Sequence, residues 1–428
     1  MSTAIIGAGL SGLCYAKQSR EPTVIYEQND HPGGLCVSHY NNWGVLTDVG
    51  PHIFFSKDKS LLNFFLRLTE MKKHKRMNHV LCKKRLVEYP FENYLGMLPS
   101  DDCLRCVQEF KKRPKYKTAP KTLDKLFLSL FGEGIYELYL KPYNQKLWKR
   151  PLSELSAKMG NRIPQPPMQH ILDSAAGKYH TGFEHQANFY YPRFGGCFSV
   201  LGNLYSIVEK QSQILLNKRV LSLQIQKNGQ IEIVFTSDRT TDAKRYDRVI
   251  STAPLPEIVH QILPKAPKKV LNAAQRLKYI GISVTAVHAA KCNIKNTFAL
   301  TIPSSYACFH RMTSIDYFGT EYQVGTGSTI LVETSHNEEL EPFDAELTRK
   351  DVILGLHNLG LVPSIHVLDS AIRYFKYAYP VYTLTHTQDV TTIRDWLRTQ
   401  QIIPLGRFGS FEYINMDKVY KQVKDELQ

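Results

Sequence analysis

Residues 2–34 read STAIIGAGLSGLCYAKQSREPTVIYEQNDHPGG, and the pattern of apolar residues and glycines in them indicates the type of fold. Its first apolar residues, 4–6, predict a short buried strand. Gly7, Gly9 and Gly12 follow at the spacing of a turn that leads directly into a helix. The first glycine makes the tight turn, the second lets a pyrophosphate approach the backbone, and the third lets helix and strand pack closely. The helix N-terminus then offers free N–H groups to an anion.

A second strand, residues 23–26, ends at Glu27, which stands twenty residues after Gly7. A carboxylate at that place accepts a hydrogen bond from a ribose 2′-OH, which favours NAD or FAD over NADP. Strand, glycine turn, helix, strand and acid occur here in the order that dinucleotide binding requires. The sequence therefore predicts a dinucleotide-binding domain at this end of the chain.

The length of 428 residues exceeds what one hydrophobic core usually organises, so we expect two or three domains. No apolar run is long enough to span a bilayer, and the first strand leaves no room for a signal peptide. Among eight scattered cysteines only Cys103 and Cys106 lie close together, and without a second pair they predict no metal site. Reduced thiols without an export signal predict a cytoplasmic protein.

The formal net charge is +15, and a basic surface can serve nucleic acid, anionic lipid or a phosphorylated substrate. The densest basic run, residues 72–85, reads KKHKRMNHVLCKKR. We interpret it as a solvated helix–loop–strand surface, with peripheral contact to a membrane or an acidic partner as the alternative. No zinc finger, ribonucleoprotein motif or aromatic–basic interleaving occurs, so no nucleic-acid partner is expected. The oligomeric state stays open.

Periodicity along the chain changes several times. In residues 61–150, apolar side chains recur every three or four positions, which is typical of helices. In residues 213–236, apolar and polar side chains alternate, as in strands, and Asn228-Gly229 is a turn signal for a hairpin. More strands follow, and the chain closes with a strand, an arginine loop between glycines and a helix start. We therefore expect an α/β fold with a Rossmann-type nucleotide domain from residues 1–60, 190–270 and 370–428, a mainly helical insert at 61–189 and an antiparallel sheet insert at 271–369.

A second glycine pair, Gly33 and Gly34, follows Glu27 within seven residues, and this resembles the two-part fingerprint of FAD enzymes of the amine oxidase type. Four further blocks resemble the UDP-galactopyranose mutase family and related amine oxidoreductases similar to protoporphyrinogen oxidase. They occur in the family's order over nearly the whole chain: VGPHIFFS (49–56), VEYPFENYL (87–95), KPYNQKLWKRP (141–151) and GRFGSFEY (406–413). The resemblance implies an FAD domain, a helical domain and a sheet over the flavin. It also implies FAD held by Gly7, Gly9, Gly12, Glu27, Gly33, Gly34 and Arg407.

The reaction of that family needs reduced flavin, whose N5 attacks the anomeric carbon of the sugar while UDP departs. The sugar ring opens, closes through a different hydroxyl and recaptures UDP without net redox change. The resemblance thus implies a mutase that interconverts pyranose and furanose forms of a UDP-sugar, UDP-galactose first, kept reduced by a donor such as NAD(P)H.

A second activity stays open, an FAD-dependent oxidase or desaturase of the protoporphyrinogen oxidase or amine oxidase type. It would use an apolar channel without a diphosphate clamp. The basic composition, together with candidate arginines and tyrosines, favours the mutase.

A departing diphosphate gathers negative charge in a closed site, so fixed cations and hydroxyl donors should surround it. Arginine suits that task because its planar fork can hold two phosphate oxygens. By resemblance, Arg162 and Arg311 bind the diphosphate and His52 lies near the flavin. The resemblance also implies substrate-binding roles for Asn144, Trp148, Tyr379, Tyr413 and Asp417.

Three positions depart from the family's pattern. Phe55 stands where bacterial mutases carry a second histidine, and Pro51 differs from the residue of the fungal-type enzymes. Asp417 occupies a place where relatives carry either an amide or an acid. A different sugar nucleotide therefore stays open.

Overall fold

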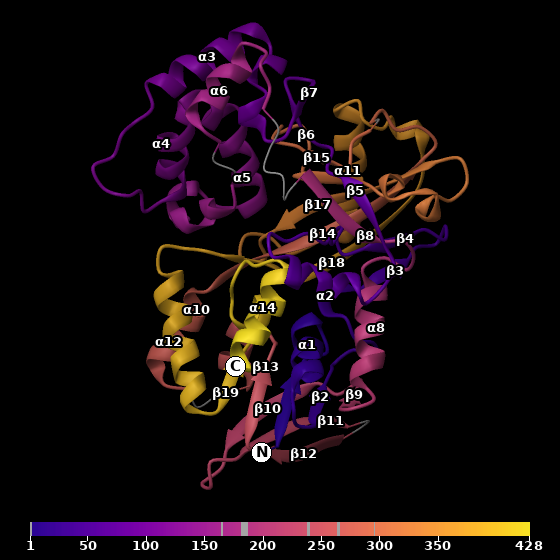
Figure 1. Cartoon of the computed structure of the whole chain (residues 1–428), viewed down its shortest axis with the longest axis vertical. Helices are drawn as coiled ribbons and strands as arrows, with labels where there is room; N and C mark the ends of the chain where they lie inside the picture. Colours follow the sequence, from indigo (N-terminus) through magenta and orange to yellow (C-terminus); the bar gives the residue numbers. More distant parts are fainter. Residues whose placement is uncertain (1, 164–165, 181–186, 238–239, 263–265, 295) are drawn as a thin grey trace.

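The computed structural model describes residues 2–163, 166–180, 187–237, 240–262, 266–294 and 296–428, and of residues 161, 162, 261 and 262 the backbone alone. Figure 1 shows a sheet with its helices at the bottom, a long sheet across the middle and a group of helices at the top. The expected α/β class, with a Rossmann-type unit and inserts, is confirmed.

The five-stranded parallel sheet takes strands from both ends and the middle of the chain. β1 lies at its centre and pairs in parallel with β13 on one side and β2 on the other. All of β1 is buried, as expected for a strand covered on both faces. The strand order is β19 (Ile402–Pro404), β13 (Arg248–Ser251), β1 (Thr3–Ile6), β2 (Thr23–Tyr26) and β9 (Gln213–Leu215).

Apolar cores form on both faces of this sheet. One face packs against α1 (Leu10–Gln18), α8 (Phe198–Val208) and α14 (Met416–Glu426). The other face packs against α10 (Lys268–Arg276), α12 (His386–Thr399) and a small antiparallel sheet. That small sheet consists of β10 (Val220–Ile225), β11 (Ile231–Ser237) and β12 (Thr240–Tyr246).

The predicted hairpin at Asn228-Gly229 is confirmed, since β10 and β11 pair in antiparallel register across it. Gly229 has a φ of +84°, a conformation that glycine adopts without steric cost.

The long sheet has seven strands, and every neighbouring pair is antiparallel except β15 and β6. It takes β6 and β7 from the range expected to be helical, and β18 overlaps the range expected to belong to the nucleotide domain. The strand order is β18 (Val367–Val381), β14 (Lys278–Ala289), β17 (Ser328–His336), β16 (Arg311–Ser314), β15 (Ala299–Thr301), β6 (Asn78–Cys82) and β7 (Arg85–Glu88).

The basic run at residues 72–85 is folded differently from the helix–loop–strand surface that we expected. It forms most of β5 (Met71–Lys75), all of β6 and the start of β7. Lys83 and Lys84 turn the chain with φ of 51° and 61°, and Cys82 pairs with Arg85 across them. Two consecutive positive φ values are typical of a tight type I′ hairpin turn, which normally carries Asn or Gly, so the lysines gave no turn signal.

The helical part packs α3 (Ser100–Lys111) against α4 (Leu123–Ile135), with a π-helical turn, η4 (Tyr136–Leu140), leading into α5 (Lys141–Trp148). A Cβ on Gly134 would press on the backbone of Cys106, so glycine permits this close helix contact. Its other elements are η2 (Phe91–Asn93), η3 (Leu95–Met97), η5 (Leu152–Glu154), η6 (Ala157–Arg162) and α6 (Met168–Ala175).

Connecting elements complete the description. They include η1 (Gly34–Cys36), β3 (Ser38–Tyr40), β4 (Leu46–Asp48), α2 (Lys59–Leu66), β8 (Asn188–Pro192), α9 (Leu255–Glu257), η7 (Ile258–Ile262), η8 (Asp316–Phe318), η9 (Thr320–Tyr322), α11 (Ala345–Asn358), η10 (Ser364–His366) and α13 (Gly406–Gly409).

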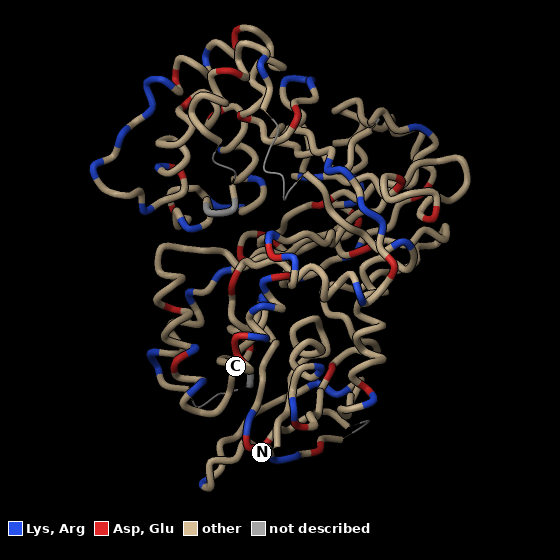
Figure 2. Tube along the Cα trace, viewed as in Figure 1, with Lys and Arg blue, Asp and Glu red and all other residues tan. Residues whose placement is uncertain are grey.

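Basic side chains are spread over the surface. Figure 2 shows lysines and arginines both on β5 and along the loop between α3 and α4. Lys72 of β5 pairs with Glu321, its ammonium nitrogen 3.1 Å from a carboxylate oxygen. No helix in the described part of the chain is long and apolar enough to cross a membrane.

Candidate functional site

A cavity of about 1540 Å³ lies where the parallel sheet, the seven-stranded sheet and the helical part meet. Its lining includes the glycine turn after β1, and in the helical part Glu92 of η2 and Ile163 after η6. Most of the residues that the sequence suggested for the site line this one cavity: Gly7, Gly9, Glu27, Gly33, Gly34, His52, Asn144, Trp148, Arg311, Tyr379, Arg407, Tyr413 and Asp417.

The glycines of this turn lie so close to neighbouring atoms that side chains at their positions would collide. Gly12 does not line the cavity but packs beneath it. A Cβ at this position would overlap the carbonyl oxygen of Gly7, so only glycine fits there. A Cβ on Gly34 would lie 3.3 Å from the Cα of Gly9, tighter than an ordinary contact. The backbone N–H of Gly33 donates to the carbonyl of Ala8 at 2.9 Å, so the two glycine segments are bonded together.

Glu27 is held at the end of β2 by backbone donors. One carboxylate oxygen accepts from the N–H of Ala8 at 2.8 Å and the other from the N–H of Asn29 at 2.9 Å. A carboxylate has about four acceptor positions, so capacity for ribose hydroxyls is left. A glycine cradle bounded by a fixed acid has the shape and donors that an FAD pyrophosphate and ribose need, and the residues present fit that group.

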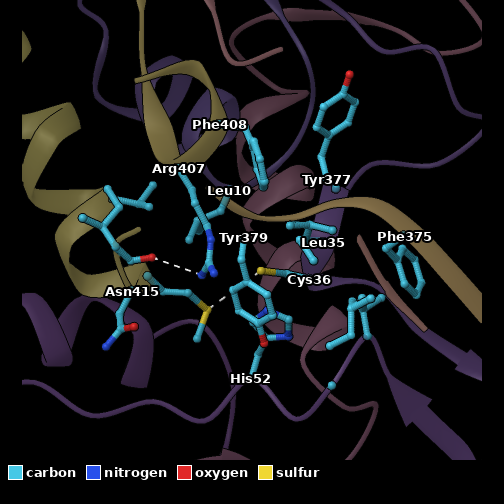
Figure 3. A pocket seen from close by; sticks show the side chains of 18 of the residues that line it. Leu10, Leu35, Cys36, His52, Phe375, Tyr377, Tyr379, Arg407, Phe408 and Asn415 are labelled. Atoms are coloured by element: carbon cyan, nitrogen blue, oxygen red, sulfur yellow. Dashed lines mark hydrogen bonds between the residues drawn. The ribbon is translucent and has the colours of Figure 1, made fainter. Parts of the chain in front are cut away.

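Arg407 follows Gly406, whose Cα faces Ser11 at the start of α1, so α13 is placed next to the glycine turn. The expected loop around Arg407 is a short helical turn. The guanidinium lies 4.5 Å from the ring centroid of Tyr413 and 5.1 Å from that of Tyr379, within cation–π range. It also donates to the carbonyl of Ile414 at 3.3 Å (Figure 3).

Trp148 completes this aromatic group. Its ring is edge-on to Tyr379 and Tyr413, with centroids 6.1 and 5.8 Å apart. Its indole N–H donates to the side-chain oxygen of Asn144 at 3.2 Å, and Asn144 donates to the carbonyl of Leu140 one turn earlier. α5 therefore presents an ordered polar and aromatic wall to the cavity.

His52 lies in the loop after β4 and is drawn with Tyr379 and Arg407 in Figure 3. Burial, supported by the positive charge of Arg407, lowers the pKa of its imidazole to about 4. The ring is therefore neutral at neutral pH. It can exchange hydrogen bonds in the cavity without adding a charge.

Arg311 begins β16 and faces Glu333 on the adjacent strand β17. Its Nε lies 3.7 Å from a carboxylate oxygen of Glu333, a side chain that is only 3% exposed. The other oxygen of Glu333 lies 3.9 Å from His310 Nε2. Glu333 thus balances the charge of Arg311 through a loose contact that leaves guanidinium donors for a ligand.

Arg76 is a further arginine of the cavity, and it was not expected from the sequence. It stacks on Phe55, with its guanidinium carbon 4.3 Å from the ring centroid. Burial, and then the nearby charge of Arg311, lower its pKa to about 10. Its Nε is buried without a hydrogen-bond partner, and in the described residues no carboxylate pairs with it. Two arginines that repel one another in a cavity favour an anion between them.

The backbone of Arg162 ends η6, but its side chain lies outside the described residues. Asp417 lines the cavity from the first turn of α14 and accepts a hydrogen bond from Ser56 Oγ at 2.7 Å.

Tyr143 and Glu333 also line the cavity but carried no role in the sequence analysis. Tyr143 directly precedes Asn144 in the block KPYNQKLWKRP, and this neighbourhood was the available sequence signal. No signal in the sequence pointed to Glu333, because only the pairing of β16 with β17 brings it to Arg311.

The family model described as flavin containing amine oxidoreductase matches residues 10–400. The chain belongs to this family. The "Probable UDP-galactopyranose mutase" of Klebsiella pneumoniae is 28% identical over 173 residues, which cover 37% of this chain and 44% of that protein. The UDP-galactopyranose mutase of Mycoplasma genitalium is 26% identical over 171 residues, covering 37% and 42%. The matched regions therefore span less than half the length of these curated relatives.

A solved structure extends the likeness of fold to the whole chain. The crystal structure of a reduced UDP-galactopyranose mutase superposes with a TM-score of 0.90, covering 100% of this chain and 93% of that one, at 21% identity. At that identity the match shows a shared fold alone.

Proposed function

We propose that the protein is a flavin-dependent mutase that interconverts the pyranose and furanose forms of a UDP-sugar, with UDP-galactose as the substrate. The observation that carries the proposal is the pair Arg76 and Arg311 in the same cavity as the glycine cradle. An apolar or amine substrate gives no reason for two neighbouring cavity arginines, whereas a diphosphate does.

FAD would be held by Gly9 and Gly34 at its pyrophosphate, by Glu27 at its ribose and by Arg407 near its ring system. When bound and reduced, for which a donor such as NAD(P)H would serve, it supplies a nucleophilic nitrogen to the sugar's anomeric carbon.

The arginines act on the leaving group. Negative charge collects on the diphosphate as its bond to the sugar breaks, and fixed cations in a cavity shielded from water stabilise that charge most. Arg76 is braced by Phe55 and Arg311 by Glu333, so neither needs to reorganise when the charge develops. We assign Arg162 to the same diphosphate.

Tyrosines add donors without adding charge. Burial raises the pKa of Tyr143 and of Tyr379 well above the ordinary value, so both hydroxyls keep their protons and can donate to phosphate oxygens. Tyr413 lies against Tyr379, with ring centroids 5.3 Å apart, and extends the same wall. Asn144, Trp148 and Asp417 would shape the pocket around the sugar and the nucleotide.

His52 stays neutral and leaves the positive charge near the flavin to Arg407. A neutral imidazole can stabilise a reduced ring through a hydrogen bond and does not compete with the arginines for the diphosphate.

The test is an anaerobic assay of the purified protein with its flavin reduced by dithionite. With UDP-galactofuranose, the pyranose form should appear on chromatography, and the oxidised protein should give none. Steady release of hydrogen peroxide with an amine or apolar substrate, without isomerisation, would support the oxidase activity and overturn the proposal.

A further inference from the structure

The loop that joins α3 to α4 gathers positive charge at the surface. Residues 111–121 read KKRPKYKTAPK, with six cations and no carboxylate, and we call them the basic loop. Apart from Arg113 and Pro120, every residue in it is exposed. In the described part of the chain, no ion pair joins any of these six cations to a carboxylate. The fold therefore leaves this charge to the solvent or to a ligand.

Both ends of the basic loop are fixed to the helical part. At its start, the guanidinium carbon of Arg113 lies 4.1 Å from the ring centroid of Phe110, and a guanidinium nitrogen donates to the Phe110 carbonyl at 2.8 Å. At its end, the carbonyl of Lys121 accepts from the N–H of Ala157 at 2.9 Å. The two prolines of the loop restrict the backbone and remove N–H donors, so neither helix continues into it. The lysines between these anchors are displayed on a supported loop.

Apolar side chains lie exposed among these cations. Tyr116, between Lys115 and Lys117, is 41% exposed. Met168, at the start of α6, is 56% exposed, and its sulfur accepts from Arg113 at 3.6 Å. An anionic bilayer suits both kinds of side chain, because cations meet its headgroups while a tyrosine ring favours the interface. A polyanion without an apolar phase would engage the cations and leave Met168 in water.

The basic loop lies apart from the cavity. In the described chain, the lining of the cavity includes no residue from 111–121. In Figure 1 the loop forms the outer edge of the helical part, and Figure 2 shows basic residues along that edge. Contact through this loop would therefore engage no residue of the cavity.

We propose that the basic loop docks the protein on an anionic lipid bilayer, with its lysines at the headgroups and Tyr116 at the interface. This inference does not depend on the proposed function. Clusters of about four to eight cations are typical of segments that bind anionic lipid, and each cation adds to the affinity. The net charge of +15 favours approach of the whole protein to such a surface.

The experiment is co-sedimentation of the flavin-loaded full-length protein with vesicles. One kind of vesicle is an equal mixture of phosphatidylcholine and phosphatidylserine, and the other is phosphatidylcholine alone. The loop variant carries Lys115→Gln, Lys117→Gln and Lys121→Gln together. A matched control variant loses the same charge at exposed positions elsewhere, through Lys210→Gln, Lys227→Gln and Lys244→Gln. Flavin content and thermal melting verify that each variant is folded.

Wild type should bind the mixed vesicles and should bind phosphatidylcholine alone about tenfold or more weakly. The loop variant should need about tenfold or more additional mixed lipid for half-maximal binding. The control variant should stay within about twofold of wild type, because salt screens charges that lie far from the bilayer. Tyr116→Ser should weaken binding about threefold, since the interface loses its aromatic ring.

An equal loss of affinity in the loop and control variants would mean that net charge alone acts, and it overturns the docking role of the loop. Equal binding of wild type to both kinds of vesicle, or binding to neither, overturns it as well. Unchanged affinity in Tyr116→Ser would overturn the interfacial place of that ring. Loop-dependent binding to duplex DNA or to polyglutamate, without binding to vesicles, would assign the loop to a soluble polyanion and overturn the proposal.

Discussion

At the scale of single residues, the surroundings of Arg76 and Arg311 suit the proposed role of holding a diphosphate. Arg76 stacks on Phe55, which stands where the resemblance leads one to expect histidine, and an aromatic face orients a guanidinium without consuming its donors. Arg311 faces a carboxylate at a distance too long for a tight ion pair. Both side chains therefore keep donors for a ligand.

Replacement of Arg76 tests this directly. Arg76→Ala should weaken UDP binding at least tenfold, because removing one partner of a desolvated charge pair costs about 2–5 kcal/mol. Arg311→Ala should behave alike, and Arg311→Lys should also be impaired because the ammonium cannot hold two oxygens. Titration with UDP measures the effect. Arg105→Ala, exposed on α3, is the control. Unchanged affinity in both alanine variants, folded and yellow, would refute the diphosphate clamp.

The sequence could predict the placement of residues that depend on local spacing. Gly7, Gly9, Gly12 and Glu27 lie within one strand–turn–helix–strand unit, so their order along the chain is enough. Arg76 could not be recognised, because it lay in a basic run that looked solvated and only the folding of β5 to β7 buries it. Glu333 likewise gains its meaning from strand pairing across the sheet.

At the scale of elements, the contact between α1 and the glycine turn fixes the cofactor end of the cavity. Gly12→Ala should abolish flavin retention, because its Cβ would overlap the Gly7 carbonyl and push helix and turn apart. Gly202→Ala, in the interior of α8, is the matched control: the nearest atom to its Cβ is a ring carbon of Phe198 at 3.6 Å. That control should keep its flavin and gain about 0.5–1 kcal/mol of stability. Absorbance at the flavin band and thermal melting report both effects. A yellow Gly12→Ala protein would show that the close packing is dispensable.

Elements with strong periodicity were predictable, and one with unusual turn chemistry was not. The β10–β11 hairpin has a glycine at its positive-φ position and was found. The turn of the β6–β7 hairpin consists of two lysines, so its strands were not predicted. As a result, a range expected to be helical contributes an edge of the seven-stranded sheet.

At the scale of the whole molecule, buried neutral histidines link stability to pH. Burial lowers the pKa of His336 to about 4, whereas the unfolded chain binds that proton near pH 6.5. Between these values the unfolded state holds more protons, so stability falls as the pH is lowered through the window. At about pH 5 the loss is at most about 2 kcal/mol for this residue.

Melting temperatures should therefore fall less between about pH 7 and about pH 5 for His336→Gln than for wild type. His357→Gln, at an exposed position on α11, should follow wild type. Parallel curves for wild type and His336→Gln would mean that this histidine titrates normally in the folded protein.

The proposed function is a sugar-nucleotide isomerisation in which the flavin is not consumed. The most direct measurement is an anaerobic reaction with many equivalents of UDP-galactofuranose per reduced protein, recording product and flavin absorbance together. The pyranose form should accumulate far beyond one equivalent while the flavin is still fully reduced at the end. Flavin oxidation in proportion to product, or no turnover by the reduced protein, would contradict it.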